Sequence, residues 1–221
     1  MRWQRERQAV AEAGAELARL GLLLGASGNV SLRLWEEGRE LVAITPRGRP
    51  CASLCAEEVV VTDFEGEPVE GDLPPSSELL LHTAVYRARR DVGAVVHTHS
   101  LYASVCAVAG LEVPPLLDEV VIRLGGGVRL AEYAFPGTED LAQRAAEALG
   151  QRNAVLLSHH GAVAVGKDLG EAVGAGLLVE RAAQVFVLAS LLGRATPLPP
   201  EVVRLEEALY QMRRRAESPE P

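Results

Sequence analysis

The chain is poor in cysteine, in positive charge and in long apolar runs. Its 221 residues include three cysteines, too few for a disulfide framework, so we expect reduced thiols. Asp and Glu outnumber Lys and Arg by 30 to 22, and the net charge of -8 disfavours nucleic acids and anionic membranes as partners. No apolar run reaches membrane-spanning length, and the N-terminal residues lack a signal-peptide pattern. We therefore expect a cytoplasmic protein that binds neither nucleic acid nor membrane.

Histidine is also scarce, yet it is not scattered. Four of the five histidines fall into two pairs, His97 with His99 and His159 with His160. Each pair ends a short apolar run rich in β-branched residues, which is typical of a buried strand. Because side chains alternate along a strand, His97 and His99 point to the same face, whereas only one of His159 and His160 can easily join them.

Two imidazoles on one face of a rigid strand, with a third close by, predict a site for a first-row metal ion. The alternative is that each histidine is a core residue with a satisfied hydrogen bond. Zinc also accepts a carboxylate ligand, and Glu78 is the natural candidate because its helix leads directly into the strand of His97 and His99. Otherwise Glu78 would only complement the helix dipole, an effect of about 0.3–1 kcal/mol.

The segment from Pro74 to Ser77 predicts the start of that helix, which should run to about Arg90. Its two hydroxyls, on Ser76 and Ser77, can cap the helix or form an anion site around the exposed N–H groups. Two glycine-containing loops can also hold a phosphate, because glycine lets the backbone approach closely and arginine adds a bidentate donor. These loops are Gly28-Asn29 and Arg47-Gly48, and each alone is equally compatible with an ordinary turn.

The order of the expected elements indicates the fold class. The expected helices cover 5–20, 76–90, 100–108, 138–149, 169–192 and 202–215, and the expected strands cover 30–34, 40–45, 59–62, 92–99, 128–131, 154–158 and 162–166. Since strands outnumber simple βαβ crossovers, we expect one three-layer αβα domain over residues 1–221, with a mostly antiparallel central sheet and helices on both faces. The helix over 169–192 is apolar on most sides and should be central or pack against another subunit.

Taken together, these residues resemble the class II aldolase/adducin family. The matching segments occur in family order and cover almost the whole chain. They are Gly21-Leu22 with Gly25 and Gly28-Asn29-Val30-Ser31, Ile44-Thr45-Pro46 with Gly48, Pro75-Ser76-Ser77-Glu78, Ala94-Val95-Val96-His97-Thr98-His99, Tyr133 with Gly137-Thr138, and His159-His160-Gly161.

The resemblance implies a set of ligands and an assembly. One zinc ion per subunit would be held by Glu78, His97, His99 and His160, the last being the histidine that precedes Gly161 in the family. The implied phosphate pocket consists of Gly28, Asn29, Arg47, Gly48, Ser76 and Ser77, with Arg47 where the fuculose-phosphate enzymes of the family have threonine. The resemblance also implies a homotetramer with active sites at subunit interfaces.

The implied activity is reversible cleavage of a phosphorylated ketose of the L-fuculose 1-phosphate type. The products would be dihydroxyacetone phosphate and lactaldehyde, formed through a metal-stabilised enediolate, with Glu78 as the base on the three-carbon fragment. Asp118 stands where these aldolases have a proton-donating tyrosine from a neighbouring subunit, so we expect Asp118 to handle the proton on the aldehyde side. The alternatives are an L-ribulose-5-phosphate 4-epimerase, a methylthioribulose-1-phosphate dehydratase, and a non-catalytic module like the adducin head, which would have lost the metal ligands.

Overall fold

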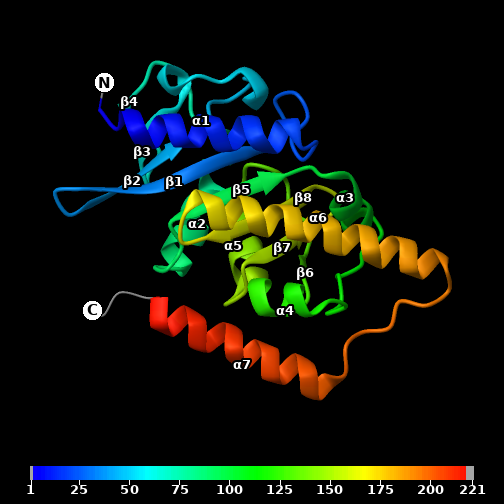
Figure 1. Cartoon of the computed structure of the whole chain (residues 1–221). Coiled ribbons are helices and arrows are strands. Elements are labelled where there is room, and N and C mark those ends of the chain that lie inside the picture. The colour runs from blue at the N-terminus through cyan, green and yellow to red at the C-terminus, as the bar shows by residue number, and fades with distance from the viewer. Residues whose placement is uncertain (1, 218–221) are drawn as a thin grey trace.

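One sheet forms the middle layer of the protein. The structure, a computed structural model, describes residues 2–217, and the eight strands within them pair in the order β4-β3-β2-β1-β5-β8-β7-β6 (Figure 1). The strands are β1 Asn29–Glu36, β2 Arg39–Ile44, β3 Val60–Asp63, β4 Pro68–Glu70, β5 Ala94–Thr98, β6 Arg129–Ala131, β7 Ala154–Leu157 and β8 Gly161–Gly166. Among these described strands every pair is antiparallel except β6 with β7, which confirms the mostly antiparallel sheet.

Helices cover both faces of this sheet, which confirms the three-layer arrangement (Figure 1). The helices are α1 Gln4–Arg19, α2 Leu79–Ala88, α3 Leu101–Val108, α4 Asp118–Leu124, α5 Glu139–Leu149, α6 Leu169–Leu191 and α7 Pro200–Glu217, with short 3-10 turns at Cys51–Ser53 and Ala56–Glu58. Two apolar clusters separate the layers. One lies between the sheet and α2 with α5, and the other between the sheet and α1, α3, α4 and α6.

Strand β5 shows how the sheet serves both cores. Ala94 and Val96 pack into the cluster beneath α6, whereas Val95 packs into the cluster beneath α2. A strand that is covered on both faces is apolar on both, which is why Ala94, Val95 and Val96 do not alternate with polar residues. His97 follows Val95 on the same face, so its ring lies on the side of α2, the helix that Glu78 directly precedes.

The start of α2, the helix α4 and the strand β4 differ from the sequence prediction. Helix α2 begins at Leu79 rather than at the serines, because the preceding segment pairs with the end of β2: Pro75 bridges Pro46, and the Ser76 N–H donates to the Thr45 carbonyl at 3.2 Å. The short helix α4 was not predicted at all. The remaining predicted helices and the β1–β2 hairpin lie where the pattern indicated, and the three cysteines are free thiols.

The long helix α6 corrects one expectation. Among the described residues it is the one helix that is long and apolar enough to cross a membrane by length and composition, with a mean hydropathy of 1.5, so the statement that no such segment exists is wrong. In the structure, 44% of the most apolar 18-residue stretch of α6 is buried inside the protein. Core helices of soluble proteins can be equally long and apolar.

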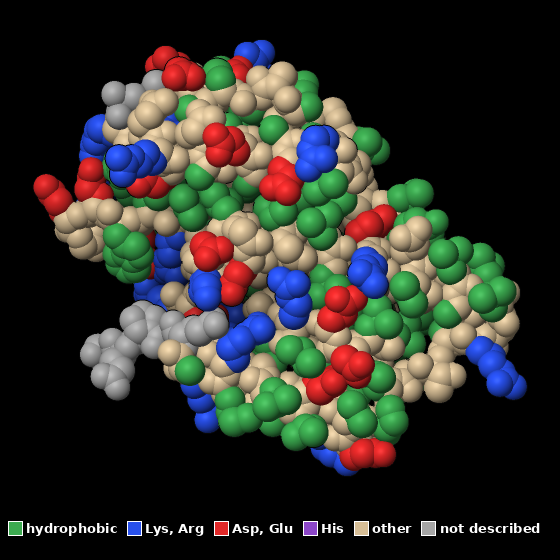
Figure 2. Space-filling model, in the orientation of Figure 1, with side chains coloured by type: hydrophobic (Ala, Val, Ile, Leu, Met, Phe, Trp, Pro, Cys, Tyr) green, Lys and Arg blue, Asp and Glu red, His purple; other side chains and the backbone are tan. Residues whose placement is uncertain are grey.

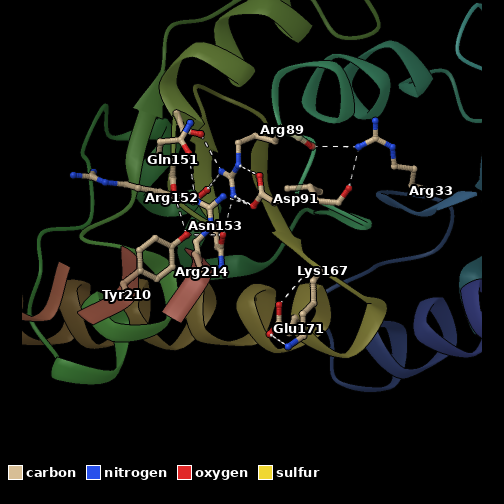
Figure 3. Close-up of polar contacts among 12 residues, drawn as sticks. Arg33, Arg89, Asp91, Gln151, Arg152, Asn153, Lys167, Glu171, Tyr210 and Arg214 are labelled. Carbon is tan, nitrogen blue, oxygen red and sulfur yellow. Dashed lines mark hydrogen bonds and ion pairs between the residues drawn. The ribbon is translucent and has the colours of Figure 1, made fainter. Parts of the chain in front are cut away.

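The C-terminal helix α7 is attached to the sheet end opposite His97. Arg89 donates to both carboxylate oxygens of Asp91 at 2.9 Å, and Arg214 of α7 pairs with the same carboxylate (Figure 3). The Tyr210 hydroxyl lies 2.9 Å from the Gln151 carbonyl oxygen, to which Arg214 also donates at 2.8 Å. These contacts fix α7 beside the beginning of β5, whereas the histidines lie at the end of that strand.

Candidate metal centre

Four side chains from separate segments meet at the end of β5. Glu78 is the residue before α2, His97 lies in β5, His99 directly follows that strand, and His160 lies in the turn between β7 and β8. Their ligand atoms all lie within 4.8 Å of one another. The two Nε2 atoms of His97 and His99 are 2.8 Å apart, and Glu78 Oε2 lies 3.1 Å from His97 Nε2. Glu78 Oε1 lies 3.3 Å from His160 Nε2.

The turn between β7 and β8 decides which histidine joins the cluster. His159 adopts a left-handed conformation with a φ of 56°, is exposed, and packs the edge of its ring against Tyr133. The next residue, His160, therefore points to the cluster. Gly161 lies so close to β5 that a Cβ atom there would stand 2.2 Å from the Thr98 carbonyl oxygen. Only glycine permits this approach, which sets the distance between His160 and the histidines of β5.

The four side chains fit a divalent metal ion. His97 Nδ1 lies 3.0 Å from the Ala162 carbonyl oxygen, which can only accept, so the proton is on Nδ1 and the Nε2 lone pair faces the cluster. Glu78 Oε1 is buried and has no hydrogen-bond partner among the described residues, which a bound cation would supply. Three imidazole nitrogens and one carboxylate are a donor set that zinc accepts.

The surroundings keep the ligands in the protonation states that a metal requires. Burial, with the nearby His97, lowers the pKa of both His99 and His160 to about 4, so both rings are neutral at pH 7. Burial alone would raise the pKa of Glu78, but its contacts with His97, His160 and Asn29 outweigh that effect and hold the pKa far below its usual range. Glu78 is therefore a carboxylate.

A cavity of about 250 Å³ opens beside the cluster, and Glu78, His99 and His160 form part of its wall. The structure brings all six predicted phosphate-binding residues to this cavity: Gly28, Asn29, Arg47, Gly48, Ser76 and Ser77. Gly28 has a φ of +77°, and a Cβ atom there would stand 2.5 Å from the His97 carbonyl oxygen, so glycine is required for this loop to lie against β5. Ala26, Ser27, Pro46, Pro136 and Gly137 also line the cavity, and sequence reasoning gave none of them a role in binding.

Behind Glu78 lies a second group of polar residues, which we call the polar series: Tyr86, Ser31, His82, Asn29 and Glu78. Sequence reasoning gave roles to Asn29 and Glu78 but missed the other three. Asn29 Nδ2 donates to Glu78 Oε2 at 2.9 Å, and Asn29 Oδ1 contacts His82 Nε2. Ser31 Oγ lies 2.6 Å from His82 Nδ1 and 2.7 Å from the Tyr86 hydroxyl. The signal was spacing: His82 is four residues after Glu78 on a helix, and Ser31 is two residues after Asn29 on a strand.

Asp118 lies apart from the cavity of its own subunit. It is the first residue of α4 and is exposed, beside Glu206 of α7. Burial, together with the charge of Asp118, raises the pKa of Glu206. Asp118 is not among the residues that line the cavity. Within one subunit the structure therefore does not bring Asp118 to Glu78 and the histidines.

Comparisons with known proteins place the chain in a family. Residues 8–187 match the class II aldolase and adducin N-terminal domain. The 5-deoxy-D-ribulose 1-phosphate aldolase of Bacillus thuringiensis is 37% identical over 90% of this chain and 92% of its own length. The L-fuculose phosphate aldolase of Escherichia coli is 36% identical over 83% of this chain and 82% of its own length. A solved L-fuculose 1-phosphate aldolase superposes with a TM-score of 0.87 at 35% identity, covering 94% of this chain and 96% of that one. The resemblance seen in the sequence is confirmed: the chain belongs to the class II aldolase/adducin family, as an enzyme of the metal-dependent lyase type.

Proposed function

We propose that the protein is a zinc-dependent aldolase, with one zinc ion per subunit, that reversibly cleaves a deoxyketose 1-phosphate. The observation that carries this proposal is the shared cavity, where three of the four ligand side chains adjoin six candidate phosphate-binding residues. L-Fuculose 1-phosphate is the first candidate substrate and would give dihydroxyacetone phosphate and lactaldehyde. The relative that is 37% identical over 90% of the chain favours 5-deoxyribulose 1-phosphate as a second candidate, which would give acetaldehyde instead.

Both candidate substrates contain the same phosphate-bearing three-carbon fragment, and the proposed site residues would bind that fragment. A divalent ion held by Glu78 and the three histidines would polarise the ketone oxygen and stabilise the charge that develops as the carbon–carbon bond breaks. Ser76, Ser77 and the glycine loops would orient the phosphate through hydroxyl and backbone N–H groups. Arg47 is exposed at the rim and adds a positive charge on that side.

Glu78 is the proposed base on the three-carbon fragment. Asn29 holds Oε2 at 2.9 Å, whereas Oε1 has no hydrogen-bond partner among the described residues. In the direction of synthesis, Oε1 would leave the metal ion and take a proton from the carbon beside the ketone, and in the direction of cleavage it would return that proton. Asn29 keeps the carboxylate in place during both transfers.

A homotetramer with active sites at subunit interfaces is part of the proposal. Helix α3, which begins two residues after His99, exposes Leu101, Val105 and Val108, with 68%, 42% and 59% of their surface accessible. Figure 2 shows further hydrophobic side chains gathered over the far end of α6, where Leu191 and Leu192 are exposed. Exposed apolar surface on this scale is typical of contact with another protein surface. Such contact would allow Asp118 of a neighbouring subunit to approach the cavity.

A cytoplasmic location without nucleic-acid or membrane partners also belongs to the proposal. It is supported by the acidic net charge of -8 and by the packing of α6 into the apolar cluster of the domain.

The deciding experiment is a cleavage assay on the purified protein. Each candidate sugar phosphate is incubated with chelator-treated and zinc-restored protein, and release of dihydroxyacetone phosphate is followed with a coupled dehydrogenase. We expect release that the chelator removes and zinc restores, and the identity of the aldehyde distinguishes the two substrates. L-Ribulose 5-phosphate and methylthioribulose 1-phosphate are run in parallel. Epimerised or dehydrated product, without dihydroxyacetone phosphate from either candidate, would refute the proposal.

A further inference from the structure

The polar series is buried along its whole length. Tyr86, Ser31 and His82 have no accessible surface, and Asn29 and Glu78 retain 4% and 7% of theirs. Asn29 and Ser31 belong to β1, and His82 and Tyr86 belong to α2. Glu78 is the residue that precedes α2. In such surroundings each polar atom needs a partner, and a wrongly oriented donor is strongly unfavourable. The positions of the hydrogens can therefore be deduced.

Glu78 sets the direction of the series. Its carboxylate only accepts, so Asn29 must present its NH2 group to Oε2 and its Oδ1 to His82. Oδ1 also only accepts, so His82 carries its proton on Nε2. Burial, with the nearby His97, lowers the pKa of His82 to about 3, which leaves Nδ1 without a proton. Ser31 then donates to Nδ1 and accepts from the Tyr86 hydroxyl.

The reverse arrangement is excluded by the same geometry. A proton on Nδ1 of His82 would leave Nε2 as an acceptor, and the Asn29 amide would have to flip to donate to it. Its Oδ1 would then face Glu78 Oε2 at the present separation of 2.9 Å, with two acceptors in contact in a buried site. Every donor in the series therefore points toward Glu78.

We propose that His82 is a positioning residue for Glu78. As the Nε2–H tautomer, it fixes the Asn29 amide so that Oε2 is held and Oε1 alone is left for the metal and the substrate proton. The part of this proposal that concerns the substrate proton rests on the proposed function. The part that concerns metal binding does not depend on which sugar is cleaved. His82 touches neither the cavity nor the candidate metal ligands through its ring.

The first test reads the tautomer directly. Nitrogen-15 NMR of histidine-labelled, chelator-treated full-length protein at pH 7 should give a neutral Nε2–H signal that is missing from His82→Gln. A neutral Nδ1–H ring or a charged ring at this position would overturn the proposal. The tautomer is read in the parent protein, and His82→Gln serves only to assign the signal.

The second test compares two substitutions at His82. The amide nitrogen of glutamine reaches about as far as Nε2, so His82→Gln keeps a donor for Asn29, whereas His82→Leu removes it at similar volume. We expect zinc affinity, measured by competition with a chromophoric chelator, to fall about 10–100-fold in His82→Leu, as is usual for loss of a group that orients a ligand. In His82→Gln it should stay within a few fold of the parent.

A matched control separates this effect from general damage to α2. Thr83 is equally buried and adjacent to His82, and among the described residues its hydroxyl bonds only to the Leu80 carbonyl of its own helix. Thr83→Val should leave zinc affinity within a few fold. Equal affinity in both His82 variants, or equal loss in Thr83→Val and His82→Leu, would refute the positioning role. If no sugar phosphate is cleaved but His82→Leu still binds zinc more weakly than His82→Gln, only the proposed function is refuted.

Discussion

The two carboxylate oxygens of Glu78 lie in different surroundings. Oε2 receives the Asn29 N–H and lies against His97, whereas Oε1 is buried, faces His160 and has no hydrogen-bond partner among the described residues. A symmetric setting would suit a residue that only binds a cation. The asymmetry suits a residue that also exchanges a proton with substrate, because one oxygen anchors the group while the other is free to react.

Replacing the carboxylate of Glu78 by an amide tests that double role. Glu78→Gln keeps the size of the side chain but removes the negative charge and the basic oxygen. We expect turnover to fall by at least about 100-fold, the usual contribution of a general base, even in protein that still contains zinc. Zinc content by elemental analysis is measured on the same samples. Full turnover in zinc-containing Glu78→Gln would rule out the base assignment.

Asp118 is tested by a similar change. If it handles the proton on the aldehyde side, Asp118→Asn should lower kcat/KM by about 100–10,000-fold without loss of zinc. The neighbouring Glu119, which pairs with Arg181, provides a matched control, and Glu119→Gln should remain near the parent value. An Asp118→Asn enzyme with unchanged kcat and kcat/KM would show that the role is wrong.

Mixing inactive subunits tests where Asp118 acts. Asp118→Asn and Glu78→Gln protein, combined under conditions that exchange subunits, should regain activity only if Asp118 serves the cavity of a neighbour. Mixed oligomers would then contain some sites with both residues intact. Light scattering on the same samples gives the oligomeric state, and failure to regain activity after verified exchange would place Asp118 within its own subunit or outside the reaction.

At the level of residues, the sequence predicted functional groups that recur at a regular spacing. It missed a residue whose role depends on contacts with residues distant in the chain. The spacing of His97 and His99 after an apolar run was enough to identify a candidate centre. The spacing of His82, four residues after Glu78, was a much weaker signal, because a lone histidine in an apolar helix is usually a satisfied core residue. Its relation to Glu78 acquires meaning only when Asn29 is known to lie between them in space.

Among the elements, prediction was best where the pattern is local. The helices with clear caps were found: the Thr138 hydroxyl and the Asp168 carboxylate each accept a backbone N–H bond at the start of their helix. The start of α2 was misplaced because the Pro46–Pro75 bridge is a contact between distant segments. Helix α4 was missed because it is short and begins soon after Pro114-Pro115, two residues that disfavour a helix.

The contact between β5 and β8 gives a prediction at the scale of elements. In Gly161→Ala the new Cβ would stand 2.2 Å from the Thr98 carbonyl oxygen, so the strands must separate beside His97 and His160. We expect a loss of roughly 1–3 kcal/mol in the free energy of unfolding, the usual range for overpacking, together with weaker zinc binding. Urea denaturation and metal titration measure the two effects.

A second glycine provides the control for that substitution. Gly174 lies inside α6, and a Cβ atom there meets only the Arg123 guanidinium at the ordinary distance of 3.5 Å. Gly174→Ala should therefore be neutral or stabilising by up to about 1 kcal/mol, because alanine is the better helix former. Equal destabilisation by both substitutions would contradict the role assigned to the β5–β8 spacing.

For the molecule as a whole, the buried histidines give the metal-free protein a defined pH dependence. Burial lowers the pKa of His82 to about 3 and the pKa values of His99 and His160 to about 4, from 6.5. Between these values the unfolded chain binds protons that the folded chain does not, so the free energy of unfolding falls as the pH is lowered through that window. At pH 5 His82 alone lowers it by about 2 kcal/mol relative to pH 7.

Chemical denaturation of chelator-treated protein at pH 7 and pH 5 measures this effect. This interval lies above the range in which most carboxylates titrate, so histidines dominate the difference. Between the two pH values, the free energy of unfolding of His82→Gln should fall by about 2 kcal/mol less than that of the parent. An identical loss in both proteins would show that His82 does not carry the predicted share.

The separation of the ligands along the chain also governs when the centre can form. Glu78, His97 and His99 are synthesised well before His160, and the turn that carries His160 is positioned only when β8 pairs with β5. A chain still emerging from the ribosome therefore has an incomplete set of ligands and a weak hold on any ion. We therefore expect the metal ion to bind once β8 has paired with β5, when the ligand types, their geometry and the metals available in the cell together select the ion.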